Sequence, residues 1–386
     1  MRIIMKIIRS INLVHKKYKK KKLAFPAPKF FTSGFFYIEI ITDEGIYGYG
    51  EISSYVDCKK IRSKIFKNII PLIEKYNNNF YLIKEKLLKN LNIKKDETDY
   101  SVFSSFLQAL LDIEGKQKNK NSFKLFRNYE KKIKLYASGG VSFEDQNYES
   151  LVEEMIQAKK NNFFGWKFRP STPRLYVDHH LRLKKKPKID LNKLILVCQK
   201  LRIKAGNKFK LMIDLGCRLK RDTQSIKFIE ELNELNFFLI EEPFTPLFKN
   251  YSFFKERLNF SLGESFFDIN KFVKFSKLNS IAYLQPDFNR IPIEKILDHQ
   301  NKIKKIIIHN WTHSISFYSN INAALVLKNC NLIEYNTLKL PNDFYFLKKN
   351  FYIKNGYLTL KKKPGLGIEF IKNDSFHDKK TSFLKS

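Results

Sequence analysis

The sequence predicts an α/β protein: a modified, TIM-like (β/α) barrel with an α+β capping domain formed by the N-terminal region and the C-terminal tail. From residue 132 onward, strand-like and helix-like segments alternate, which is typical of a parallel barrel sheet. Three acidic residues end successive strand-like segments and lie 27 and 23 residues apart: Asp214, Glu241 and Glu264. Each step has room for one strand, one helix and two loops, which is the repeat of such a barrel.

Residues 1–130 are predicted to form the capping domain. Residues 3–14 have the composition of a first strand, and residues 35–53 have strand composition on both sides of an Asp-Glu-Gly turn, which predicts a hairpin. Residues 61–127 predict helices, because apolar residues recur there at helical spacing.

Residues 131–339 are predicted to form the barrel, and residues 340–386 to pack back on the capping domain. Seven strand candidates fall at residues 132–138, 164–170, 208–214, 237–242, 260–265, 280–287 and 304–310, and a following strand at residues 331–336 contains Glu334. Helical patterns such as residues 147–161 and 224–235 lie between most of them. The stretch 171–188 interrupts the alternation with two prolines and a basic run, so we expect a long loop that moves as a lid over the mouth.

Composition narrows the range of partners. The chain of 386 residues is 43% hydrophobic, which is enough for a large core. Its net charge is +34, but the lysines are spread along the whole chain and no nucleic-acid-binding motif is present. We therefore expect no nucleic-acid partner, and instead a small anionic substrate drawn by the positive field.

We also expect a cytoplasmic protein that does not bind membranes. Charges interrupt every apolar run before it could span a bilayer, and the N-terminal basic cluster follows the apolar part, the reverse of a signal peptide. The cysteines lack metal-site spacing and are expected to be free thiols of a reducing compartment. They are Cys58, Cys198, Cys217 and Cys330.

The ends of the predicted strands carry the residues that suggest chemistry. In a parallel barrel all strand ends face one mouth, so the carboxylates of Asp214, Glu241 and Glu264 should converge there. Oxygen ligands of this kind suit Mg²⁺. Lys167 and Arg169 alternate along one strand and should both point inward, although a pair of solvated cations would give the same pattern.

Two further strand ends place an aspartate beside a histidine. Asp287 and His309 end neighbouring strand candidates, and the carboxylate could orient the imidazole and raise its basicity. A structural aspartate and a buried, hydrogen-bonded histidine are the alternative. Glu334 ends the next strand and could equally be a surface carboxylate, while His313 is a nearby alternative to His309.

In chain order, these motifs resemble the enolase superfamily of the mandelate racemase/muconate lactonizing enzyme type, most of all its mandelate racemase-like acid-sugar dehydratases. The series is Lys-x-Arg, Asp, Glu-Glu-Pro, Gly-Glu, Gln-Pro-Asp and His-Asn-Trp. The segments ITDEGIYGYGE (41–51), ALLDIEGK (109–116) and PGLGIEF (364–370) resemble the capping region of the same family. The resemblance covers nearly the whole chain, and it implies a homo-oligomer.

The resemblance also implies roles for the residues at the strand ends. It implies that Asp214, Glu264 and Glu241, the first glutamate of its pair, bind Mg²⁺. It implies that Lys167 holds the substrate carboxylate or stabilises its enolate, and that the substrate is an acid sugar or another carboxylate. These residues would together stabilise the negative charge that forms when the proton beside a carboxylate is removed.

The remaining residues indicate which reaction follows. The resemblance implies that Asp287 and His309 form the general acid/base dyad, and that Glu334 hydrogen-bonds the opposite carboxylate oxygen. Arg169 stands where the family often has a second lysine base, and arginine stays protonated. One-base chemistry through His309 favours a dehydratase that converts a sugar acid into a 2-keto-3-deoxy acid.

Other functions stay open on the sequence alone. A racemase or epimerase would use the same enediolate, a cycloisomerase or other lyase could share the fold, and a catalytically silent protein could bind a ligand on it. Segments 15–30 and 51–57 are candidates to face the substrate. The lysine-rich first segment suits an acid sugar, and a solvated loop with the same compositional bias fits it equally well.

Overall fold

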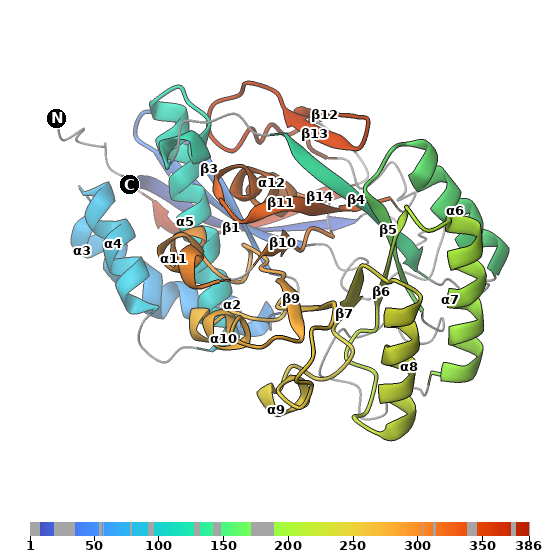
Figure 1. Cartoon of the computed structure of the whole chain (residues 1–386). Coiled ribbons are helices and arrows are strands. Elements are labelled where there is room, and N and C mark those ends of the chain that lie inside the picture. Colours follow the sequence, from blue (N-terminus) through green and yellow to red (C-terminus); the bar gives the residue numbers. More distant parts are fainter. Residues whose placement is uncertain are drawn as a thin grey trace.

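The computed structural model describes residues 8–18, 35–53, 56, 58–77, 79–91, 96–126, 132–141, 148–170, 189–303, 305–311, 314–337, 346–371 and 376–385. Eight parallel strands form a closed barrel (Figure 1). They are β4 (Ile133–Val141), β5 (Gly165–Arg169), β6 (Lys210–Asp214), β7 (Leu239–Glu241), β8 (Phe260–Leu262), β9 (Ile281–Leu284), β10 (Ile306–Ile308) and β11 (Cys330–Asn336). Strand β11 closes the barrel because it pairs with both β10 and β4. The predicted barrel is confirmed.

Helices cover the outside of the barrel (Figure 1). They are α6 (Tyr148–Lys160), α7 (Leu191–Ala205), α8 (Thr223–Glu234), α9 (Phe248–Tyr251), α10 (Ile269–Phe275), α11 (Ile293–His299) and α12 (Ile315–Val326). Asp190, Asp222 and Asp268 start α7, α8 and α10, because each side chain accepts a hydrogen bond from a backbone N–H of the first turn. Outward strand residues pack on these helices, and alternate residues fill the barrel interior: Tyr136, Met212, Leu239, Ile307 and Leu332.

A four-stranded antiparallel sheet forms the centre of the capping domain. Its order is β14 (Phe376–Lys385), β1 (Ile8–Tyr18), β2 (Phe35–Thr42) and β3 (Tyr47–Ile52). The predicted hairpin is confirmed by β2 and β3, and Gly45 takes the turn conformation with φ +76°. The helical segments of this domain are α2 (Cys58–Lys64), the π-helix η1 (Ile65–Ile69), α3 (Ile70–Tyr76), α4 (Phe80–Asn90), α5 (Glu97–Gln117) and the 3₁₀ turn η2 (Ser122–Leu125).

Strand β1 reaches further along the chain than predicted. Residues 15–18 continue the strand, although the sequence suggested that a loop begins there. The reason is that β1 is paired on both sides, with β2 and with β14. Lys16 is also held within the strand, because its Nζ lies 3.0 Å from Asp378 and over the rings of Phe346 and Phe370.

The tail after residue 340 divides between the two parts of the molecule, instead of packing on the capping domain as a whole. Strand β14 pairs with β1, whereas β12 (Phe351–Lys354) and β13 (Tyr357–Leu360) form a hairpin on barrel strand β4. Strand β5 pairs with β4 only from Ala137 onward, which leaves the start of β4 open to β13.

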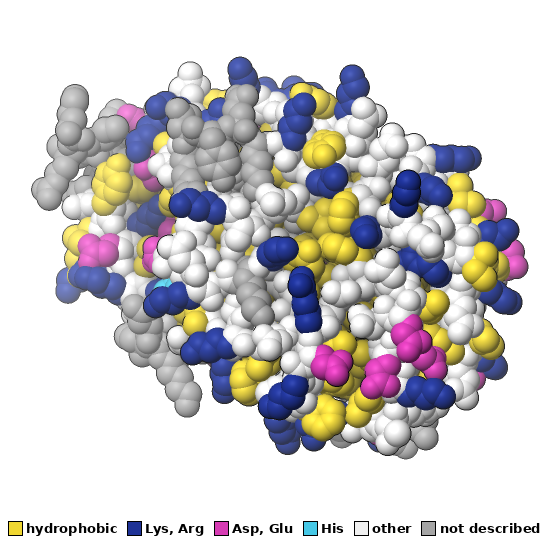
Figure 2. All heavy atoms as spheres, in the orientation of Figure 1, with side chains coloured by type: hydrophobic (Ala, Val, Ile, Leu, Met, Phe, Trp, Pro, Cys, Tyr) yellow, Lys and Arg dark blue, Asp and Glu magenta, His cyan; other side chains and the backbone are white. Residues whose placement is uncertain are grey.

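The surface agrees with a general excess of basic residues. Figure 2 shows lysine and arginine side chains spread over the face in view rather than gathered into one patch. Within the described ranges, no helix is both long and apolar enough to cross a bilayer. Three of the cysteines are buried free thiols, as predicted: Cys198, Cys217 and Cys330.

Asp112 on α5 joins segments that lie far apart in the sequence. Its buried carboxylate accepts hydrogen bonds from the backbone N–H groups of Leu366 (2.7 Å) and Tyr49 (3.2 Å). The carboxylate also lies 2.7 Å from Nζ of Lys116. The fit requires glycine at Gly365, where φ is +67° and an added Cβ would lie 2.2 Å from Oδ1 of Asp112. The hairpin, α5 and the tail are therefore one structural unit.

We predict that Gly365→Ala lowers the free energy of unfolding by about 3 kcal/mol, because it combines a left-handed backbone with a clash against a buried carboxylate. Gly45→Ala is the matched control, because Gly45 has a similar φ but no atom within 4 Å of an added Cβ. That control should lose only about 1 kcal/mol. Urea unfolding followed by circular dichroism measures both, and equal losses would contradict the role given to the contact with Asp112.

Candidate active site

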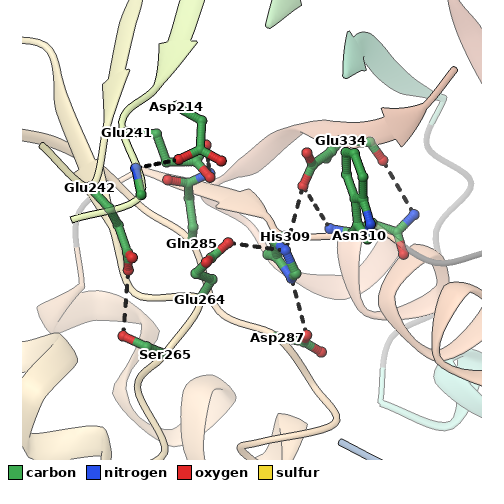
Figure 3. Close-up of polar contacts among 12 residues, drawn as sticks. Asp214, Glu241, Glu242, Glu264, Ser265, Gln285, Asp287, His309, Asn310 and Glu334 are labelled. Carbon is green, nitrogen blue, oxygen red and sulfur yellow. Dashed lines mark hydrogen bonds and ion pairs between the residues drawn. The ribbon is translucent and has the colours of Figure 1, made fainter. Parts of the chain in front are cut away.

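The predicted site residues gather at the C-terminal mouth of the barrel (Figure 3). They come from successive strand ends: Lys167 and Arg169 from β5, Asp214 from β6, Glu241 from β7, Glu264 from the loop after β8, Asp287 after β9, His309 after β10, and Glu334 from β11. All except Arg169 are buried. The closed barrel thus brings together residues that span much of the sequence.

Lys167 lies between two carboxylates. Its Nζ is 2.7 Å from Oε2 of Glu241 and 2.8 Å from Oε1 of Glu334, and the side chain is 4% exposed. Burial opposes its charge, but the two carboxylates outweigh burial and hold the pKa of Lys167 well above its ordinary value. Lys167 is therefore a fixed positive charge inside the mouth.

Glu241 carries the strongest charge conflict of the site. Burial is the main cause that raises the pKa of Glu241 to about 8. Lys167 lowers this pKa, but the neighbouring carboxylates, first that of Asp214, raise it again. Its Oε2 also accepts a hydrogen bond from Nε2 of Gln285 at 2.8 Å. Its Oε1 is buried and accepts no hydrogen bond from the described residues. A buried oxygen of this kind suits a positively charged ligand.

Arg169 faces the next strand end. Its Nη1 lies 3.3 Å from Oδ2 of Asp214, whose Oδ1 accepts a hydrogen bond from the backbone N–H of Gly216 at 2.9 Å. The absence of a side chain at Gly216 makes room for the guanidinium, because an added Cβ would lie 2.4 Å from Nη2 of Arg169. Arg169 points inward, as predicted, and its partner is Asp214.

Asp287 and His309 form the predicted pair (Figure 3). Oδ2 of Asp287 lies 3.1 Å from Nδ1 of His309, and Nε2 of the same ring lies 3.1 Å from Oε2 of Glu264. Burial would lower the pKa of His309, but Glu264 and then Asp287 outweigh burial and raise it to about 10. In this arrangement the imidazole is held as its cation.

Glu334 contacts both the backbone and the charged side chains of the mouth. Its Oε2 accepts a hydrogen bond from the backbone N–H of Asn310 at 3.1 Å. Burial opposes ionisation, but Lys167 and then His309 lower its pKa below the ordinary value. In the structure Glu334 is therefore a hydrogen-bond acceptor toward Asn310 and an ion-pair partner of Lys167.

Sequence reasoning gave no role to several residues that support the site. Gln285 was recognised only as part of the Gln-Pro-Asp motif, and it binds Glu241 directly. Glu242 was set aside in favour of Glu241, and its backbone is left-handed, with φ +40°. Its side chain turns toward Cys217 and Ser265, away from the barrel axis. The two adjacent glutamates therefore have different partners, Glu241 at the mouth and Glu242 beside Cys217 and Ser265.

Glu51 links the capping domain to the barrel. It lies near the end of β3, and its Oε2 accepts a hydrogen bond from the backbone N–H of Ser316 (3.0 Å) at the start of α12. Burial raises its pKa to about 7, although hydrogen bonds from Ser314 and Ser316 lower it. Sequence reasoning had named segment 51–57 only as a candidate to face the substrate.

Some predictions fall on residues outside the described ranges. The proposed lid at 171–188 and the alternative histidine His313 lie there, and so does the larger part of segment 15–30. Within segment 51–57, only residues 51–53 and 56 are described. Those predictions stay as they were made.

The three predicted metal ligands fit a hard cation by their chemistry. Asp214, Glu241 and Glu264 provide oxygen donors on adjacent strand ends, and Oε1 of Glu241 accepts no hydrogen bond from the described residues. Within the described part of the chain, no three acidic, histidine or cysteine side chains stand as a ready ligand set. The reason is visible in the contacts, because Glu264 turns to His309 and Asp214 to Arg169.

Comparisons with known proteins agree with this architecture. Residues 150–374 match the family described as Enolase C-terminal domain-like. One relative is the arabinonate dehydratase of Saccharolobus solfataricus, which is 24% identical, with 85% of this chain and 86% of that protein covered. Another is the D-gluconate/D-galactonate dehydratase of Picrophilus torridus, which is 23% identical, with 86% and 85% covered.

Solved structures share the fold. The 3,6-anhydro-D-galactonate cycloisomerase from Zobellia galactanivorans has a TM-score of 0.74 at 18% identity, with 95% of this chain and 97% of that chain covered. A mandelate racemase/muconate lactonizing enzyme from Sulfitobacter sp. has a TM-score of 0.76 at 17% identity, with 95% and 93% covered.

We predict that Glu51 makes stability fall as the pH rises. Its carboxyl loses a proton near pH 4.5 when unfolded but near 7 when folded, so the folded state binds more protons in this window. Glu51→Gln keeps an acceptor for Ser316 and removes the titration. The variant should therefore gain about 3 kcal/mol relative to the wild type between pH 4.5 and pH 8. Urea unfolding at both pH values measures this, and parallel pH curves would contradict it.

Proposed function

Because this chain belongs to the enolase C-terminal domain-like family, we propose that it is a Mg²⁺-dependent dehydratase of a sugar acid. The observation that carries the proposal is the contact between Asp287 and His309, at a mouth that also holds the buried cation of Lys167. The names of the arabinonate and D-gluconate/D-galactonate dehydratases support a sugar acid as the substrate class.

The difficult step of such a reaction is loss of the proton beside a carboxylate. This proton is very weakly acidic, and its removal loads negative charge onto the carboxylate oxygens. Asp214, Glu241 and Glu264 would hold the divalent cation, which supplies electrostatic stabilisation of that charge when it is bound. Lys167 adds a permanent positive charge at the same mouth.

His309 is the proposed base and the proposed acid. In its neutral form the imidazole takes the proton from the α-carbon at Nε2, while Asp287 accepts a hydrogen bond from Nδ1–H. The imidazolium then donates a proton to the hydroxyl on the next carbon. That C–O bond breaks as the carbon–carbon double bond forms, water leaves, and the enol becomes a 2-keto-3-deoxy acid. His309 can act as a base only after Glu264 turns away from Nε2, because the present contact holds the ring as its cation.

A racemase or epimerase is the second candidate, since it would pass through the same enediolate. It requires a base on each face of the substrate. Arg169 occupies the position of the second base, and a guanidinium paired with a carboxylate stays protonated. The position of Arg169 therefore supports elimination over racemisation.

We predict that His309→Asn lowers release of keto acid from a panel of sugar acids at least about 100-fold, because the only proposed base is lost. Exchange of the α-proton with deuterated water should fall in parallel. His299→Asn on α11 is the control and should leave the rate unchanged, because the described contact of the His299 ring is with the carbonyl of Lys295 in its own helix. A His309→Asn protein that released keto acid at the wild-type rate would remove the dyad from the mechanism. If the wild-type protein exchanged the α-proton with deuterated water but released no keto acid, the result would favour the epimerase.

We predict that Mg²⁺ stabilises the wild-type protein and that Glu241→Gln abolishes the effect. Saturation at 100 times the dissociation constant would add about 2.7 kcal/mol to the free energy of unfolding, seen as a rise in melting temperature. Glu242→Gln is the control, because its carboxylate faces Cys217 and Ser265 and should leave the Mg²⁺ effect intact. Calorimetric titration gives an independent reading, and a wild-type protein that neither binds nor is stabilised by Mg²⁺ would overturn the metal assignment.

A further inference from the structure

Asn320 on α12 bonds to both strand ends that carry the acid/base pair. Its side chain is 2% exposed. Its Oδ1 accepts a hydrogen bond from the backbone N–H of Phe288, the residue after Asp287, at 3.1 Å. Its Nδ2 donates to the backbone carbonyl of His309 at 3.1 Å. One amide group therefore spans the two chain segments whose side chains form the pair.

The sheet alone gives little support at this position. Strands β9 and β10 are in register at one residue pair, Leu284 with Ile306. Beyond that pair, one backbone hydrogen bond joins the two segments within the described ranges, from the N–H of His309 to the carbonyl of Pro286. The residues of the pair lie past the ends of these short strands. An asparagine is suited to bridge such ends, because its planar amide carries a donor and an acceptor at a fixed separation.

The turn after Asp287 is also held from the capping domain. The carbonyl of Phe288 accepts hydrogen bonds from Oγ of Ser104 and Nε2 of Gln108, both on α5. Oε1 of Gln108 accepts a hydrogen bond from Oγ of Ser319, the residue next to Asn320. These side chains are all buried. The backbone of Phe288 is thus fixed on both its N–H and its C=O, and Asn320 connects this fixed turn to the carbonyl of His309.

We propose that Asn320 is a positioning residue that holds Asp287 and His309 at hydrogen-bond distance. It keeps Nδ1 of the imidazole directed at the carboxylate, so that Nε2 stays directed into the mouth. Asn320 does not touch the reacting atoms, and its effect passes through the backbone of the two segments. The inference rests on the proposed function for its catalytic consequence, because displacement of a general base by about 1 Å can lower a rate about 100-fold.

Asn322 on the same helix provides a matched control. It is also a fully buried asparagine, but its side chain bonds to Asn121 and to the carbonyls of Tyr318 and Leu366, and to neither strand end. Asn320→Leu and Asn322→Leu each remove one buried amide, and both should lower the denaturation midpoint. Only Asn320→Leu should lower kcat for sugar-acid dehydration, by 10- to 100-fold, about the range expected for a misplaced base, with KM changed less than about 3-fold.

The imidazole itself gives a reading that does not depend on turnover. In protein labelled with ¹⁵N-histidine, the Nδ1 proton of His309 should give a hydrogen-bonded, downfield signal, which is assigned by its loss in His309→Asn. That signal should shift upfield or disappear in Asn320→Leu and stay in Asn322→Leu. If Asn320→Leu does not fold, Asn320→Asp serves instead, because it keeps the acceptor for Phe288 and loses the donor to His309.

The two readings separate failure of this inference from failure of the proposed function. A wild-type protein that dehydrates no sugar acid overturns the proposed function, and the imidazole signal still decides the role of Asn320. An unchanged signal in the Asn320 variant overturns the inference. So does an equal loss of kcat in the Asn320 and Asn322 variants, because that result would show a general effect of lost stability.

Discussion

The arrangement of the barrel mouth depends on compensation of buried negative charge. Five carboxyl groups meet three cations there. With all five ionised, the mouth would carry two net negative charges, the charge that one divalent cation neutralises. The carboxylates are Asp214, Glu241, Glu264, Asp287 and Glu334, and the cations are Lys167, Arg169 and His309. Lys167 and His309 each serve more than one carboxylate, and the remaining deficit appears at Glu241 as a raised pKa and an oxygen without a donor.

The positions of the site residues could be predicted from the sequence because a parallel barrel repeats, and a repeat fixes where strands end. Pairing within the mouth could not be predicted, because it depends on how the barrel closes. Lys167 near the start of the barrel reaches Glu334 in its last strand only because β11 pairs with β4. That contact explains why Glu334 is an acceptor. The position of the β12–β13 hairpin could not be predicted either, because it depends on the part of the β4 edge that β5 leaves unpaired.

Helix α12 shows why buried polar residues escape prediction from patterns. Its sequence is mostly apolar, and Asn320 and Asn322 are two positions apart with the same side chain. Their partners differ because one lies over the strand ends of the dyad and the other over the tail. Glu51 of β3 accepts a hydrogen bond from the backbone of Ser316 at the start of the same helix, which connects the helix to the capping sheet. The capping domain and the chemistry of the barrel are therefore joined through one helix.

Strand β1 lies inside the capping sheet, yet its two partners are made at different times during protein synthesis. Strand β2 follows it in the chain, whereas β14 begins at Phe376. One edge of β1 therefore lacks this partner until synthesis has passed Phe376, and an unpaired edge is a template for aggregation. Lysine side chains on such an edge oppose association with other chains. Lys16, which later binds Asp378, would protect this edge, a use during folding that is separate from any use in recognition.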